Sequence, residues 1–153
     1  PDWMKAVIQR VTEASVEIEG KINGEIGSGY LILLGIEEAD EKEDADWLAN
    51  KICTLRIFND NQNNMNLALA DVDGKMLVVS QFTLHAKTKK GTRPSFIRAA
   101  KPDQAIPLYN YFIEVLETTS KTKVETGIFG ADMKVRLLND GPVTIIIDTK
   151  NKS

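Results

Sequence analysis

The chain is organised around one stretch, Leu138-Asn139-Asp140-Gly141-Pro142-Val143-Thr144. Asp-Gly followed by Pro is a strong turn signal, and the apolar run that begins at Val143 predicts a buried strand. We therefore predict a rigid turn between two buried strands. Glycine lets another molecule approach the main chain closely, and proline removes one N–H, so outward-facing carbonyl oxygens remain as acceptors. Only about 5–6% of X-Pro bonds are cis in folded proteins, so the local sequence alone favours a trans Gly141–Pro142 bond.

The composition indicates an ordinary globular chain with no metal or cofactor. It has 153 residues, 42% hydrophobic and 27% charged, and a net charge of −3 that does not indicate nucleic-acid binding. With one cysteine, Cys53, and one histidine, His85, neither an internal disulfide nor a Cys/His metal cluster is possible. Carboxylate-only metal sites have no recognisable motif, and Cys53 is expected to be an inert core thiol.

The ends and the apolar runs of the chain bear on its location. No run is long enough to span a bilayer, and no basic-then-apolar leader precedes Met4. We therefore expect a cytoplasmic protein without a membrane partner. Pro1-Asp2-Trp3 is interpreted as a cloning remnant, which leaves residues 4–153 as a single domain.

Local patterns predict both strands and helices. Apolar patterns predict strands over residues 6–11, 15–19, 22–26, 30–36, 75–80, 123–126, 133–138 and 143–147. Helical spacing of apolar residues predicts helices over residues 41–55 and 102–120, the first with Asp40 and Glu43 as a capping box. Asp71-Val72-Asp73-Gly74 is interpreted as a hairpin turn. The predicted fold class is α+β, with a curved, mainly antiparallel sheet or barrel and two helices.

A basic segment interrupts this net-acidic chain. Residues 85–102 contain no Asp or Glu. The basic residues within them are Lys87, Lys89, Lys90, Arg93, Arg98 and Lys101. A local reversal of charge is typical of a phosphate-binding face, and a solvated basic loop has the same pattern.

The end of the strand that starts at residue 75 carries the candidate chemistry. Thr83 and His85 would share a strand face, so a Ser80 or Thr83 nucleophile with a histidine base is conceivable. No Gly-x-Ser-x-Gly pattern surrounds Ser80, which argues against it. Alternatively, backbone N–H groups around Phe82 and Thr83 bind a developing oxyanion, and one such donor contributes roughly 3–4 kcal/mol when preorganised.

Several motifs occur along the chain in the order of a known family. They are Met4-Lys5-Ala6-Val7-Ile8-Gln9-Arg10-Val11, Ser80-Gln81-Phe82-Thr83-Leu84, Gly91-Thr92-Arg93-Pro94-Ser95-Phe96, Gly127-Ile128-Phe129-Gly130-Ala131-Asp132-Met133 and Asn139-Asp140-Gly141-Pro142-Val143-Thr144. On these motifs the chain resembles the D-aminoacyl-tRNA deacylases, which remove D-amino acids mischarged onto tRNA. The Ser-Gln-Phe-Thr and Gly-Pro-Val-Thr motifs are the functional ones of that family and show no departure here.

The resemblance implies a homodimer with its active sites at the subunit interface, where each subunit inserts a cis Gly141–Pro142 bond into the site of the other. The residues that it implies for catalysis are Ser80, Gln81, Phe82 and Thr83. Those that it implies for substrate binding are Gly141, Pro142, Val143, Met133, Phe129 and Arg10, the last as a brace of the Gly-Pro loop. Lys87, Lys89, Lys90 and Arg93 are expected to contact the tRNA.

The implied reaction is hydrolysis of the ester bond at the acceptor end of D-aminoacyl-tRNA, carried out by main-chain groups and the 2′-hydroxyl of the tRNA. Carbonyl oxygens of Gly141 and Pro142 would hold the ammonium group, so that only an L side chain is driven into them. Glycyl-tRNA would then escape exclusion. Two other functions remain open, namely a non-catalytic RNA-binding dimer and a hydrolase that uses Ser80 or Thr83 with His85.

Overall fold

The computed structural model describes residues 4–150, so the predicted cloning remnant at residues 1–3 lies outside the described residues. The strands are β1 (Lys5–Ile18), β2 (Lys21–Ile26), β3 (Gly29–Gly35), β4 (Phe58–Asn59), β5 (Met65–Leu67), β6 (Lys75–Ser80), β7 (Val124–Thr126) and β8 (Lys134–Asp148). The helices are α1 (Lys42–Thr54) and α2 (Pro102–Ser120), and two 3₁₀ turns are η1 (Leu69–Val72) and η2 (Phe82–His85).

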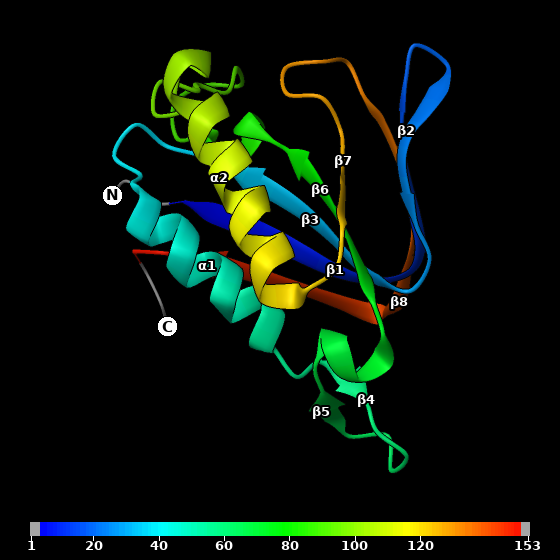
Figure 1. Cartoon of the computed structure of the whole chain (residues 1–153). Coiled ribbons are helices and arrows are strands. Elements are labelled where there is room, and N and C mark those ends of the chain that lie inside the picture. Colours follow the sequence, from blue (N-terminus) through cyan, green and yellow to red (C-terminus); the bar gives the residue numbers. More distant parts are fainter. Residues whose placement is uncertain (1–3, 151–153) are drawn as a thin grey trace.

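One curved sheet dominates the fold (Figure 1). Its strands follow the order β2-β1-β3-β6-β7, and β8 pairs with β1 along the edge opposite to β3. The pairs made by β1 are antiparallel, whereas β3–β6 and β6–β7 are parallel. The predicted curved sheet with two helices is therefore confirmed, with a parallel half that the sequence pattern did not distinguish.

The sheet is buried on both faces near its centre. Alternate residues of β3 point to opposite faces, so Tyr30 and Ile32 join one apolar cluster while Leu31 joins a second. Helices α1 and α2 cover the first face, and β2 and the start of β8 curl over the second (Figure 1). This double burial explains the continuous apolar run of β3. No helix within residues 4–150 is long and apolar enough to cross a bilayer.

The predicted turn at the organising stretch is a bulge within a single strand. Asn139 of β8 pairs with Val11 and Thr144 pairs with Gln9, so residues 140–143 oppose Arg10 alone. The residues that signal a turn therefore leave the ladder as a four-residue bulge, and the strand continues on both sides of it. The expected burial of the following run is also wrong in part, because β8 is an edge strand and Ile146 is 67% exposed.

Two local predictions are corrected by hydrogen bonds. Asp44 accepts the N–H of Glu41 at 2.9 Å, so the capping box of α1 lies one residue later than Asp40 and Glu43. Residues 71–74 form the end of η1 and its exit instead of a hairpin turn, because β5 pairs with β4 and β6 pairs with β3.

Asp40 occupies the turn before α1 and is buried there. One carboxylate oxygen accepts the Glu37 N–H at 2.7 Å, while the other has no hydrogen-bond partner within residues 4–150. Burial raises the pKa of Asp40 to about 7; the charges of Asp44 and Glu37 act in the same direction, and the Glu37 N–H and Lys150 oppose them. The folded state therefore binds this proton more tightly than the unfolded chain does.

We expect the Asp40→Asn substitution to stabilise the protein at pH 8 by ~1 kcal/mol or more, because each pKa unit corresponds to about 1.4 kcal/mol. The wild type loses stability as the pH rises from about 4, the pKa of an unfolded Asp, towards 7, and the neutral amide removes that loss. Urea unfolding of both proteins at pH 5 and pH 8 measures the effect. An equal difference at the two pH values would contradict this account of Asp40.

Candidate active site

A pocket of about 240 Å³ lies where the C-terminal ends of β3 and β6 meet α2 and the loop before β8. The residues that line it are Leu34, Ile36, Val79, Ser80, Gln81, Phe82, Ala100, Ala105, Phe129, Gly130, Ala131, Asp132, Met133 and Val135. Five of these, Ser80, Gln81, Phe82, Phe129 and Met133, were predicted from the sequence as site residues. The pocket brings together a segment that ends β6 and another more than forty residues later.

The main chain at the pocket turns sharply instead of continuing as a strand. The Gln81 N–H donates to the Leu34 carbonyl at 2.8 Å, and the Leu84 N–H donates to the Gln81 carbonyl at 3.2 Å, which starts η2. The first N–H groups of such a turn, those of Phe82 and Thr83, have no acceptor within it. The Gln81 side-chain amide donates to the Thr83 hydroxyl. Phe82 both lines the pocket and is 56% exposed, so this residue lies at the mouth of the pocket.

His85 is directed away from Thr83. A 3₁₀ turn rotates by about 120° per residue, so residues two apart do not lie on one face, and the expectation that Thr83 and His85 share a strand face is wrong. His85 is buried, and its Nδ1 lies 3.1 Å from Glu37 Oε1. Glu37 had no predicted role; its only signal in the sequence is an acidic residue two positions after the buried strand β3.

The bulge of β8 is exposed at its tip and held at its base. Gly141 and Pro142 are exposed, and the peptide bond between them is cis, as the resemblance implies. Arg10, which is 5% exposed, donates from Nε to the Asp140 carbonyl at 2.8 Å and from Nη1 to the Ile57 carbonyl at 2.6 Å. Arg10 thus contacts the loop, as expected, and links it to the segment before β4.

Asn139 closes the base of the bulge from within. Its Oδ1 accepts the Val143 N–H at 2.7 Å, and its Nδ2 donates to the Val143 carbonyl at 3.1 Å. The Val143 side chain, predicted to bind substrate, is buried in the core of its own chain. Asn139 was part of the quoted motif but had no predicted role, since only the folded loop reveals both of its contacts.

The pocket and the bulge lie far apart on one chain. Val135 lines the pocket, and Gly141 follows six residues later along the same extended strand. At ~3.3 Å per residue this separation is about 20 Å. Figure 1 shows β8 starting beside the loop that leaves β7 and then running down and across beneath β1. A single chain therefore does not bring the two predicted halves of the site together.

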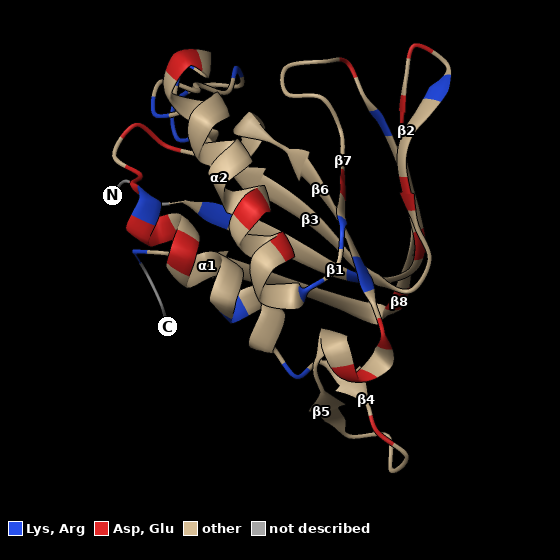
Figure 2. Ribbon diagram, viewed as in Figure 1, with Lys and Arg blue, Asp and Glu red and all other residues tan. Residues whose placement is uncertain are grey.

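The basic segment forms a loop beside the pocket. The Lys87 N–H donates to the Ser95 carbonyl at 2.7 Å and the reverse bond is 2.9 Å, so the two ends of the tip are paired. The exposed side chains of Lys89, Lys90 and Arg93 lie between them. Figure 2 shows this basic loop next to the N-terminal end of α2. Phe96 contacts the Phe82 ring edge-on, with centroids 5.0 Å apart, so the loop is joined to the pocket mouth.

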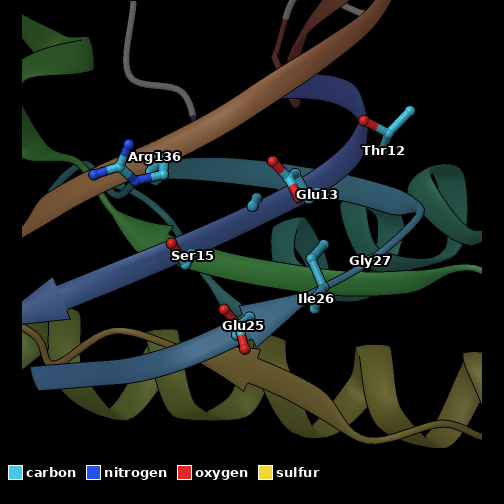
Figure 3. A pocket seen from close by; sticks show the side chains of 8 residues that line it. Thr12, Glu13, Ser15, Glu25, Ile26, Gly27 and Arg136 are labelled. Carbon is cyan, nitrogen blue, oxygen red and sulfur yellow. The ribbon is translucent and has the colours of Figure 1, made fainter.

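A roomier cavity, of about 430 Å³, lies on the side of the sheet formed by β1, β2 and β8. Figure 3 shows Glu13 and Ser15 from β1, Glu25 from β2 and Arg136 from β8 around it. None of the predicted site residues lines this cavity. Its size alone does not make it the site, because its lining contains neither the predicted residues nor any aromatic residue like those of the smaller pocket.

Comparison with known proteins identifies relatives of this chain by sequence and by fold. D-aminoacyl-tRNA deacylases of Flavobacterium psychrophilum and Flavobacterium johnsoniae are 62% and 59% identical to this chain over 149 residues, covering 97% of this chain and 99% of each relative. A solved structure described as a c-Myc DNA Unwinding Element Binding Protein has a TM-score of 0.88 at 41% identity, covering 94% of this chain and 97% of that one. A probable eukaryotic D-amino acid tRNA deacylase shares the fold, with a TM-score of 0.84 at 16% identity, over 95% of this chain and 99% of its own.

The fold and these relatives define an enzyme class, that of hydrolases acting on carboxylic esters of tRNA. The model of the D-Tyr-tRNA(Tyr) deacylase family matches residues 7–148, and the chain belongs to this family. The family and the enzyme class predicted from the motifs are thereby confirmed.

Proposed function

We propose that this protein hydrolyses the ester bond of D-aminoacyl-tRNA, releasing a D-amino acid and free tRNA, and so removes D-amino acids from translation in the cytoplasm. The observation that carries the proposal is the 3₁₀ turn Phe82–His85, which begins at pocket residues Gln81 and Phe82 and leaves the N–H groups of Phe82 and Thr83 without an acceptor inside the turn. An ester carbonyl held there would develop its negative charge against fixed donors, with the 2′-hydroxyl of the tRNA assisting.

The second half of the proposed site is the Gly141–Pro142 bulge of a partner subunit. Its carbonyl oxygens would accept hydrogen bonds from the substrate ammonium group, each contributing about 1.5–3 kcal/mol. With the ammonium and the ester both fixed, a D side chain points to solvent and an L side chain collides with the bulge. The contacts of Arg10 and Asn139 make the bulge resist displacement. Glycine has no side chain to collide, so we expect glycyl-tRNA to be cleaved as well.

Edge strand β8 is suited to join the two protomers. Apart from its pairing with β1 its other edge is open within the described chain, and it exposes Val135, Leu138 and Ile146. The unpaired N–H and C=O groups of an open edge strand can pair with a strand of another chain. If two copies of β8 run antiparallel, so that Gly141 reaches Met133 of the other copy, the twofold axis passes close to residue 137. Each pocket would then be completed by the bulge of the other protomer.

The basic loop supports the same substrate. Lys87, Lys89, Lys90 and Arg93 belong to the loop that the Phe96–Phe82 contact joins to the pocket mouth. The phosphates of an acceptor stem would follow there from a terminal adenosine bound in the pocket. A protein that only bound RNA through these residues would be indifferent to the attached amino acid. The amino acid dependence of the reaction therefore separates the two functions.

We expect the wild type to deacylate D-Tyr-tRNA at least about 100-fold faster than L-Tyr-tRNA, since each 1.4 kcal/mol of collision gives about tenfold discrimination. Thr83→Ala and His85→Ala should both retain D-selective turnover, because neither side chain serves as nucleophile or base. Release of labelled tyrosine measures these rates. If the wild type cleaves neither substrate, the hypothesis of a non-catalytic RNA-binding dimer is favoured. If Thr83→Ala or His85→Ala abolishes cleavage of D-Tyr-tRNA, the mechanism with a side-chain nucleophile and a histidine base is favoured.

A further inference from the structure

We infer that His85 and Glu37 form a positioning pair that fixes the Phe82–His85 turn, and with it the N–H groups of Phe82 and Thr83, against the end of β3. The inference rests on the proposed function, because it assigns those N–H groups to catalysis. Both side chains are almost fully buried, 3% and 5% exposed, and His85 Nδ1 lies 3.1 Å from Glu37 Oε1. Glu37 itself is held in place, since its backbone N–H donates to Asp40 at 2.7 Å.

The turn is attached to β3 at both of its ends. At its start, the Gln81 N–H donates to the Leu34 carbonyl at 2.8 Å. At its end, the His85 ring lies against Gly35 so closely that a Cβ there would be 2.9 Å from His85 Nε2. The contact between His85 Nδ1 and Glu37 Oε1 orients the ring in this space. Phe82 and Thr83 lie between these two attachments. Loss of the His85 contact would therefore free the C-terminal end of the segment that carries the two N–H donors.

The geometry favours a proton on Nδ1 of His85. Nε2 is buried and has no hydrogen-bond partner within residues 4–150, so a proton on Nε2 would be left without an acceptor. A proton on Nδ1 is donated to the Glu37 carboxylate. One imidazole nitrogen thus contacts Glu37 and the other faces Gly35, so neither is directed at the Thr83 hydroxyl. His85 is therefore a positioning residue and not a base.

The inference is tested with His85→Leu, which keeps a buried apolar side chain but removes the donor, and His85→Asn, whose Nδ2 takes the place of Nδ1. Removal of one oxyanion donor costs about 10²–10³-fold in kcat, so a donor that is only loosened should lose less. We expect His85→Leu to lower kcat for D-Tyr-tRNA about tenfold with KM changed less than about threefold, and His85→Asn to restore kcat to within about threefold.

Hydrogen exchange of the Phe82 and Thr83 amides provides a readout that does not require turnover, and exchange in His85→Leu should be faster than in wild type and His85→Asn. Tyr111→Phe is the control, since it removes a partly buried hydrogen bond away from the turn, that of the Tyr111 hydroxyl to Asp46 at 2.6 Å, between the two helices. It should lower stability without changing kcat.

Each possible outcome has a distinct meaning. Unchanged exchange and kcat in His85→Leu would overturn the positioning pair, as would an equal fall of kcat in Tyr111→Phe. A wild type that does not cleave D-Tyr-tRNA would refute the proposed function instead, and faster exchange in His85→Leu would still show that the pair holds the turn.

Discussion

Replacement of Gly141 by alanine is expected to reduce kcat/KM for D-aminoacyl-tRNA by about 100-fold or more while leaving the chain folded. Gly141 has a φ of +148°, and a Cβ there would lie 2.7 Å from Val143 Cγ2, 2.8 Å from the Val143 backbone nitrogen and 3.2 Å from Arg10 Nη2. Two of these neighbours belong to the bulge itself and the third to its buried brace, so the bulge must shift. A shift of about 1 Å at a reacting centre is enough for a 10²-fold loss.

Gly20→Ala is the matched control for this prediction. Gly20 also has a positive φ, +78°, but a Cβ there would meet nothing within 4 Å. Gly20→Ala should lower the free energy of unfolding and leave turnover of D-Tyr-tRNA within about threefold of wild type. Rates measured under single-turnover conditions compare the two variants. Equal rates for Gly141→Ala and wild type would mean that the bulge does not contact the substrate.

The second large effect is expected for Leu138→Lys. Leu138 lies next to the proposed twofold axis and is 56% exposed in the single chain. In the dimer the substitution would place two ammonium groups close together in an apolar contact, which is unfavourable through both desolvation and repulsion. We expect a monomer at micromolar concentrations and at least a 100-fold loss of deacylation, because each pocket then lacks the bulge of a partner.

Sedimentation velocity and activity assays over a range of protein concentrations measure this effect. Activity per protomer of Leu138→Lys should rise with concentration as dimers reform, whereas that of Gly141→Ala should not. Met65→Lys serves as the control, since Met65 is 53% exposed but lies in the separate two-stranded sheet. A dimeric Leu138→Lys protein with full activity would rule out β8 as the interface.

Elements whose pattern is local were predicted well from the sequence. The apolar spacing of residues 102–120 gave helix α2 with the observed bounds, and the short apolar run within residues 75–80 gave β6. The site was predicted less evenly. Ser80, Phe82 and Met133 line one pocket, as predicted. That prediction came from the family motifs, because neither segment by itself indicates that the end of β6 and the loop before β8 lie side by side.

What the sequence could not predict depends on contacts between distant residues. The organising stretch becomes a bulge because β1 continues to pair on both sides of it, a fact that lies outside residues 138–144. Thr83 and His85 separate because the Gln81 N–H bonds to β3 and bends the chain. Similarly, His85 pairs with Glu37 across forty-eight positions, and no periodicity in either segment indicates that partner.

The distance between pocket and bulge along β8 has a genetic consequence. In the proposed dimer each catalytic centre takes its pocket from one polypeptide and its bulge from the other. A mixed dimer made from one chain with a defective bulge and one with a defective pocket would contain one doubly damaged centre and one intact centre. Two inactive alleles of this gene should therefore complement each other when expressed in the same cell.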